Sequence, residues 1–155
     1  MTHYDPAKME KHPEGGAFRE VFRSGQRVTT VDGRNRCAAT HIYFSLESGE
    51  VSVFHRVSSD EIWNLYRGDG LTLYLLPQEG AQLEKIELSA KSCRYCHVVP
   101  AGWWQAAVPL AGKVLVGCTV APGFEFEDFE IMTPAGSCGR YLLHQGAEYR
   151  RLMAS

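Results

Sequence analysis

Several common features are absent from this sequence, and each absence narrows the class of protein. No apolar run approaches the roughly 18 residues of a membrane-spanning helix. The first 16 residues, MTHYDPAKMEKHPEGG, lack the apolar centre of a secretory signal peptide. The five cysteines are odd in number, and without an export signal they are expected to be free thiols. We therefore expect a cytoplasmic protein that makes no contact with a membrane.

The chain also lacks a strong charge of one sign. Its net charge is −2, so there is no electrostatic basis for binding nucleic acid, which requires clustered Lys and Arg. Arginines are dense between residues 19 and 36, but Glu14, Glu20 and Asp32 lie among them. This pattern is typical of a solvated surface or of a contact with a small molecule.

Helical periodicity is scarce, and short segments of strand composition dominate instead. Turn residues such as Gly68-Asp69-Gly70 and Pro122-Gly123 separate these segments at intervals of about 8 to 12 residues, which predicts an all-β sandwich or small barrel. With 155 residues and no linker, we expect one domain over residues 1–155. The expected strands are 17–22, 38–46, 51–57, 61–66, 71–76, 83–88, 97–99, 105–108, 114–120 and 124–131. We also expect an arm over 1–16 and a short helix over 139–153 that Gly146 interrupts.

The segment from Gly49 to Gly68, GEVSVFHRVSSDEIWNLYRG, carries the most chemical information. It predicts a strand with His55, a turn, and a second strand that opens with Glu61. An imidazole and a carboxylate on neighbouring strands can act as a base and its orienting acid, or as two metal ligands.

The spacing of these residues resembles the first motif of the cupin superfamily. Gly49, His55, Glu61 and Gly68 match its landmarks, whereas Val57 stands where the motif has a second histidine. The second motif is matched by Pro100-Ala101-Gly102, but Gln105 occupies its histidine position.

Within the cupins, the chain is similar to the single-domain branch called domain of unknown function 985 (DUF985). The segments that carry this resemblance span residues 12 to 129; they are HPEGG with FRE, IYF, FHR with SDEIW, VPAG and VGCTVAPGF. The resemblance implies a double-stranded β-helix, or jelly roll, that is usually a homodimer and binds a small molecule. It implies no agreed activity, because relatives include epimerases, dehydratases, metal-dependent dioxygenases and plain binding proteins.

A metal site is one interpretation of these residues. His55 and Glu61 are suitable ligands and Gln105 is a weak third, so the set falls short of two histidines and one carboxylate. His41 adds a second imidazole only if it faces inward. No cofactor is therefore required, and a divalent metal is an option.

Metal-free acid–base chemistry is the preferred interpretation. Epimerisation, isomerisation or dehydration beside a carbonyl needs a base, an acid and donors for the developing enolate. We expect His55 as the base, Glu61 as its orienting group, and Tyr66 or Tyr43 as the acid.

The substrate is expected to be a sugar or nucleotide-sugar derivative, because aromatic walls with a few polar groups are typical of small-molecule cavities. A metal-dependent enzyme and a non-catalytic binding protein remain the alternatives. The expected substrate-binding residues are Arg19, Gln105, Trp63, Trp103 and Phe54.

Overall fold

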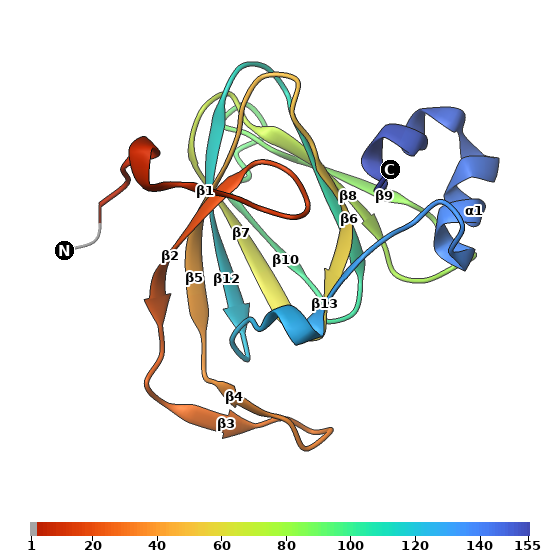
Figure 1. The fold of residues 1–155 in the computed structure, drawn as a ribbon. Coiled ribbons are helices and arrows are strands. Elements are labelled where there is room, and N and C mark those ends of the chain that lie inside the picture. The colour runs from red at the N-terminus through yellow and green to blue at the C-terminus, as the bar shows by residue number, and fades with distance from the viewer. Residues whose placement is uncertain (1–2) are drawn as a thin grey trace.

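The computed structural model describes residues 3–155, so the first two residues of the expected arm lie outside it. Two antiparallel sheets face one another (Figure 1). The six-stranded sheet has the order β1 (Glu10–Lys11), β2 (Ala17–Arg23), β5 (Thr40–Leu46), β12 (Val114–Ala121), β7 (Asp60–Arg67) and β10 (Cys96–Val99). The five-stranded sheet has the order β13 (Phe129–Ile131), β6 (Ser52–Val57), β11 (Trp104–Pro109), β8 (Leu71–Leu76) and β9 (Glu84–Leu88). The predicted all-β jelly roll is confirmed.

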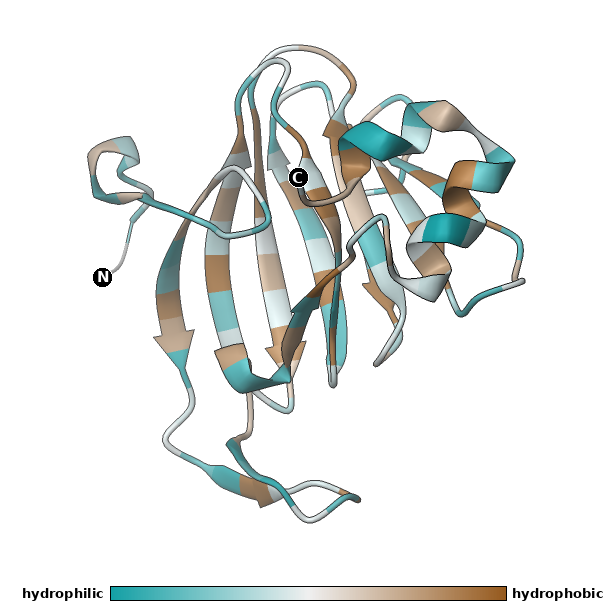
Figure 2. Ribbon diagram, turned by 45° about the vertical axis from the view of Figure 1, so that its right-hand side comes forward, coloured by the Kyte–Doolittle hydropathy of each residue, from teal (hydrophilic) through white to brown (hydrophobic). Residues whose placement is uncertain are grey.

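Hydrophobic and hydrophilic residues alternate along several strands (Figure 2). The buried side chains form two cores, because alternate residues of a strand point to opposite faces of its sheet. Between the sheets, Phe44, Trp63 and Val116 of the six-stranded sheet pack against leucines of β8. On the outer side of the five-stranded sheet, Phe54 and Trp104 pack under α1 (Ser137–Gln145) and η3 (Ala147–Leu152). Neighbouring residues on one strand thus serve different cores.

The C-terminal helix is confirmed in outline, with Gly146 separating α1 from η3. No helix among residues 3–155 is long and apolar enough to cross a membrane. Two smaller elements complete the chain. The 3₁₀ turn η1 (Pro6–Lys8) precedes the arm, and a hairpin of β3 (Arg27–Thr29) and β4 (Asn35–Cys37) extends away from the sheets (Figure 1).

The prediction of a half-exposed strand over residues 124–131 is wrong for most of its length. Only β13 forms there, after the 3₁₀ turn η2 (Phe126–Asp128). The alternation of aromatic and acidic residues in this segment arises from tertiary contacts and not from a strand. Its aromatic side chains pack together, and its acidic side chains pair with arginines. Phe124 and Phe126 pack on Phe129, while Asp128 is bound by Arg36 of the hairpin through bonds of 2.7 and 2.9 Å.

Candidate functional site

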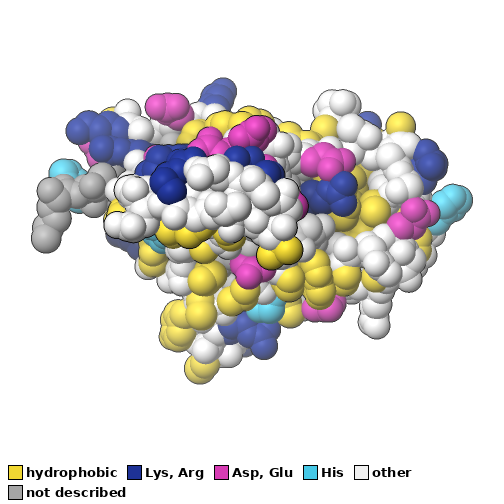
Figure 3. Space-filling model, turned by 90° about the horizontal axis from the view of Figure 1, so that it is seen from below, with side chains coloured by type: hydrophobic (Ala, Val, Ile, Leu, Met, Phe, Trp, Pro, Cys, Tyr) yellow, Lys and Arg dark blue, Asp and Glu magenta, His cyan; other side chains and the backbone are white. Residues whose placement is uncertain are grey.

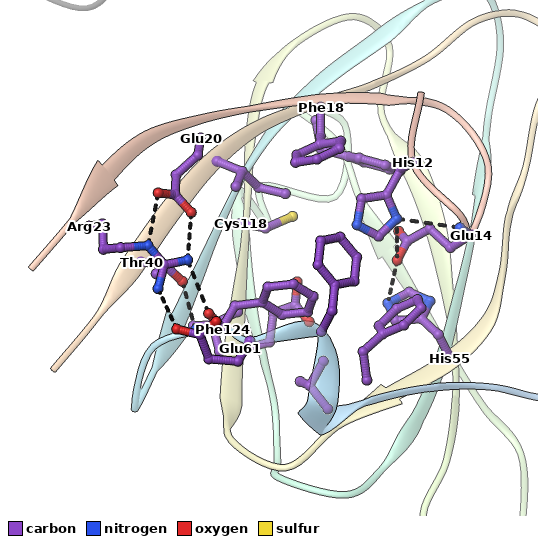
Figure 4. A pocket seen from close by; sticks show the side chains of 17 residues that line it. His12, Glu14, Phe18, Glu20, Arg23, Thr40, His55, Glu61, Cys118 and Phe124 are labelled. Carbon is purple, nitrogen blue, oxygen red and sulfur yellow. Dashed lines mark hydrogen bonds and ion pairs between the residues drawn. The ribbon is translucent and has the colours of Figure 1, made fainter. Parts of the chain in front are cut away.

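A cavity of about 90 Å³ lies between the two sheets, at the end that the segment from Phe124 to Phe129 covers (Figure 4). Its polar lining comes from the N-terminal arm, from strands β2, β5, β6, β7 and β12, and from Glu125, and its apolar lining is mainly phenylalanine. The buried lining side chains that could act as acids, bases or nucleophiles are His12, Glu14, His55, Glu61 and Cys118.

The arm reaches the cavity through a tight turn. The amide of Gly15 donates to the carbonyl of His12 at 3.0 Å, and the amide of Val53 donates to the carbonyl of Glu14 at 2.8 Å. Gly15 has φ +106°, and a Cβ there would lie 2.2 Å from the carbonyl oxygen of Val51. Only glycine fits such a position, so this turn fixes both His12 and Glu14 against β6.

Glu14 lies between two imidazoles. Its Oε2 is 3.1 Å from Nε2 of His55 and 3.3 Å from Nδ1 of His12, and its Oε1 accepts a hydrogen bond from Oγ of Ser52 at 2.8 Å. These contacts place one carboxyl oxygen between two ring nitrogens (Figure 4).

The other partners of the two rings assign their tautomers. Nδ1 of His55 is 2.8 Å from the carbonyl oxygen of Val53, which only accepts, so Nδ1 carries hydrogen. Nδ1 of His12 accepts from the amide of Glu14 at 3.4 Å. When both rings are neutral, Nε2 of His55 presents its lone pair to Oε2 of Glu14, whereas the single lone pair of His12 Nδ1 is shared between the Glu14 amide and that oxygen. A proton on Oε2 of Glu14 then makes the hydrogen bond to His55.

Burial favours this neutral arrangement. His55 is only 2 % exposed, and desolvation lowers its pKa to about 3 and that of His12 to about 4. Desolvation, with a contribution from the charge of Glu61, raises the pKa of Glu14 well above its usual value.

Glu61 is held by a separate relay of hydrogen bonds. Nε1 of Trp63 donates to Oε1 of Gln105 at 2.7 Å, and Nε2 of Gln105 donates to Oε2 of Glu61 at 2.6 Å. Because the indole N–H only donates, it fixes the orientation of the amide. Gln105 and Trp63 are fully buried behind the cavity wall.

The protonation of Glu61 is balanced near neutrality. Desolvation raises its pKa to about 7, although the hydrogen bonds from Gln105 and Cys118 act in the opposite direction. The thiol of Cys118 lines the cavity beside this carboxyl, and burial raises its pKa well above the ordinary value. Glu61 can therefore both accept and return a proton near pH 7.

The mouth of the cavity carries an ion-pair network. Arg23 donates to both carboxylate oxygens of Glu20 at 3.0 and 2.8 Å and to Oε1 of Glu125 at 2.8 Å. It also donates to the carbonyl of Phe124 at 3.2 Å. Seen from below, basic and acidic side chains gather at this end of the molecule beside exposed apolar ones (Figure 3).

The structure brings together only some of the side chains expected from the sequence. His55 and Glu61 both line the cavity, whereas Gln105 and Trp63 lie behind Glu61 and support it. Phe54 lies under the C-terminal helix, on the opposite face of β6 from His55, and Trp103 packs against the core between the sheets.

The two tyrosines and Arg19 are not brought to the cavity. Tyr43 is opposite Arg19 in the pairing of β5 with β2, and its ring lies 6.0 Å from that of Tyr66. Tyr66 is 46 % exposed, and its hydroxyl is 3.0 Å from Nε2 of His41. None of these four residues lines the cavity, which takes its β5 lining from Thr40, Ile42 and Phe44.

Sequence reasoning did not anticipate His12 and Glu14 as partners of His55. The available signal was the run HPEGG, whose two glycines predict a turn that points the preceding side chains in a fixed direction. Which strand the turn would face depends on tertiary contacts, which local sequence does not specify.

The expected metal ligands do not form a metal site in this arrangement. Both ends of the Gln105 amide are engaged, by Trp63 and by Glu61, and Nε2 of His55 faces Glu14. Within residues 3–155, no group of three or more His, Cys, Asp or Glu side chains has a geometry that could hold a metal ion.

The fold and this cavity define a cupin. The model of the "Cupin superfamily (DUF985)" matches residues 5–132, so the chain belongs to the DUF985 family of that superfamily. No curated protein matches the chain.

Solved structures agree with this assignment. A protein from Shewanella oneidensis is 33% identical, with a TM-score of 0.82 over 96% of this chain and 93% of its own. A hypothetical protein from Leishmania major is 28% identical, with a TM-score of 0.78 over 95% and 92%. Oxalate decarboxylase from Bacillus subtilis shares the fold alone, at 13% identity and a TM-score of 0.55 over 82% of this chain and 31% of that one.

Proposed function

We propose that this cupin is an acid–base enzyme that epimerises, isomerises or dehydrates a small polar molecule such as a sugar derivative. One observation carries the proposal: a single cavity contains two buried carboxyl groups in different protonation environments. Glu61 is poised to lose and gain a proton near pH 7, while Glu14 holds its proton against two neutral imidazoles. Carboxyl pairs with separated pKa values are a recurrent basis for assigning base and acid.

The proposed roles follow from these environments. Ionised Glu61 removes a proton from the carbon beside a carbonyl, and Glu14 donates its proton to the developing enolate oxygen. Reprotonation of the carbon completes an epimerisation or isomerisation; donation to a leaving hydroxyl instead releases water. His55 and His12 position the proton on Glu14, so the role of His55 differs from that of the base expected from sequence.

The fold is compatible with catalysis, since oxalate decarboxylase from Bacillus subtilis has the same fold. That likeness supports a catalytic cavity and not a particular reaction. A cytoplasmic homodimer belongs to the same proposal, and light scattering of the purified chain measures the subunit number.

Exchange of carbon-bound hydrogen with solvent tests the proposal without knowledge of the true substrate. The chain is incubated in D₂O with a neutral aldose, a ketose, an amino sugar and a uronate, and proton NMR follows the loss of C–H signals. Glu61→Gln should lower the rate for the responsive sugar by about 10²–10⁴-fold. Equal rates in the variant, or no exchange above buffer for every compound, would contradict the proposal.

A further inference from the structure

The cavity has an excess of acidic side chains. Four carboxyl groups line it, and the guanidinium of Arg23 is the one Lys or Arg side chain in the lining among the described residues. That guanidinium is already bonded to Glu20 and Glu125 at the mouth. The imidazoles of His12 and His55 are buried and neutral, so they add no positive charge. An incoming anion would therefore find no unpaired cation.

Phenylalanine rings form most of the remaining wall. Phe124 lies 4.9 Å from Phe126 and 6.0 Å from Phe129 between ring centroids, and Phe18 and Phe44 line the opposite side from β2 and β5. The faces of aromatic rings attract cations, and this attraction is strongest where the site is desolvated. Such rings combined with buried carboxyl groups suit a positively charged nitrogen.

We propose that the ligand of this cavity is a small organic cation, a protonated amine or a quaternary ammonium group. The proposal rests on the proposed function and narrows its substrate to a molecule that bears such a nitrogen. Nucleotide sugars and sugar phosphates are disfavoured, because a phosphate would lose its hydration without gaining a counter-charge inside the protein.

Binding of a cation should be coupled to proton release. The groups that face Glu61 or share its cavity are Glu14 and His12 from the arm, His55 from β6, Cys118 from β12, and Glu20, Arg23 and Glu125 at the mouth. A bound cation favours the ionised form of Glu61 and so lowers its pKa from about 7. Affinity for the cation should therefore rise with pH between 6 and 8.

Three compounds of nearly equal shape but different charge show whether binding depends on charge, and a fourth, smaller cation shows whether it depends on size. Choline is cationic, 3,3-dimethylbutan-1-ol is its neutral isostere, and 3,3-dimethylbutanoate is anionic; tetramethylammonium is a smaller cation. Isothermal titration calorimetry of the full chain at pH 8 should show a cation binding at least about 10-fold more tightly than the neutral alcohol, with the anion weakest. Equal or tighter binding of the alcohol or the anion, or no binding of either cation, overturns the proposal.

Two variants and one matched control test whether the cation binds in this cavity. Glu61→Gln should weaken binding of the cation about 10-fold and remove its dependence on pH, as a carboxamide does not ionise. Phe126→Ala removes a half-exposed ring from the cavity mouth, and Phe22→Ala removes an equally exposed ring that does not line the cavity. Of the two phenylalanine variants, only Phe126→Ala should weaken binding, by about 3- to 10-fold; equal losses in these two variants contradict the site.

The two proposals can fail separately. Deuterium exchange on a neutral sugar or a uronate that requires Glu61, together with no preference for the cations, would refute the cationic ligand and leave the acid–base function standing. Selective cation binding without any exchange would refute the catalysis alone.

Discussion

The two faces of the six-stranded sheet carry similar polar chains in different surroundings. On the inner face, Trp63 and Glu61 are linked through Gln105 of β11, in the facing sheet, by hydrogen bonds of 2.7 and 2.6 Å, and all three side chains are almost completely buried. On the outer face, the hydroxyl of Tyr66 lies 3.0 Å from His41, whose ring is 2.8 Å from the hydroxyl of Thr119. The hydrogen bonds in the two chains are similar in length, and the difference in burial decides how far the pKa of each group is shifted.

This difference shows which polar residues can take part in chemistry. Glu61 and Tyr66 belong to one strand, five residues apart, so alternation sends their side chains to opposite faces. Desolvation moves the pKa of Glu61 to about 7, whereas the exposed tyrosine remains in contact with water.

The largest loss of stability is expected from Gln105→Leu. This change leaves the buried N–H of Trp63 without an acceptor and Glu61 without its donor. Each unsatisfied buried group costs about 1–3 kcal/mol, so the free energy of unfolding should fall by about 2–4 kcal/mol in urea titrations. Gln82→Leu, at an exposed position, is the matched control and should change it by less than about 0.5 kcal/mol. Similar losses in both variants would mean that the relay contributes nothing.

Glu61→Gln should change how stability depends on pH. The folded-state pKa of Glu61 is raised from 4.5 to about 7, so its stabilising contribution is full below pH 4.5 and is lost as pH rises through 7. The variant lacks this loss. Its free energy of unfolding relative to the native chain should therefore increase between pH 5 and pH 8, on the order of 2 kcal/mol. A constant difference across this range would show that Glu61 titrates normally.

Glu14→Gln should have a smaller effect, because the carboxamide imitates a protonated carboxyl group. Its NH₂ can donate to the lone pairs of His55 and His12, which keeps both contacts. We expect the free energy of unfolding at pH 7 to change by less than about 1 kcal/mol. A loss of about 3–5 kcal/mol would instead indicate that Glu14 is ionised against a cationic histidine, since breaking a buried ion pair has that cost.

The smallest effect is expected on the outer face. Tyr66→Phe removes one exposed hydrogen bond to His41 and should lower the free energy of unfolding by less than about 0.5 kcal/mol. Its Glu61 titration, followed by carboxyl-carbon NMR, should match that of the native chain. A displaced titration would connect the two faces and make the outer tyrosine relevant to the cavity.

The fold, and the part of the candidate site that lies on β6 and β7, could be predicted from the sequence. Period-two alternation and turn residues located most strands, and the spacing of His55 and Glu61 placed both on the cavity wall. Alternation also contained the information to exclude Tyr66, which lies an odd number of residues from Glu61 on the same strand.

The rest of the site depends on contacts between distant segments. Glu14 meets His55 only because the arm turns at Gly15 and bonds to Val53. The segment from Phe124 to Asp128 imitates a strand in its pattern, yet the hairpin arginines and the neighbouring rings hold it over the cavity. Local patterns do not encode such partners.

The way the arm is attached has a practical consequence. It pairs with β2 through the two residues of β1, and the turn that follows delivers His12 and Glu14 to a cavity built otherwise from later strands. A recombinant version trimmed to begin at β2 (Ala17–Arg23) would lose β1, His12 and Glu14 together. Such a protein would lack the proton donor of the proposed function, so after trimming for crystallisation or display we expect it to bind its ligand without converting it.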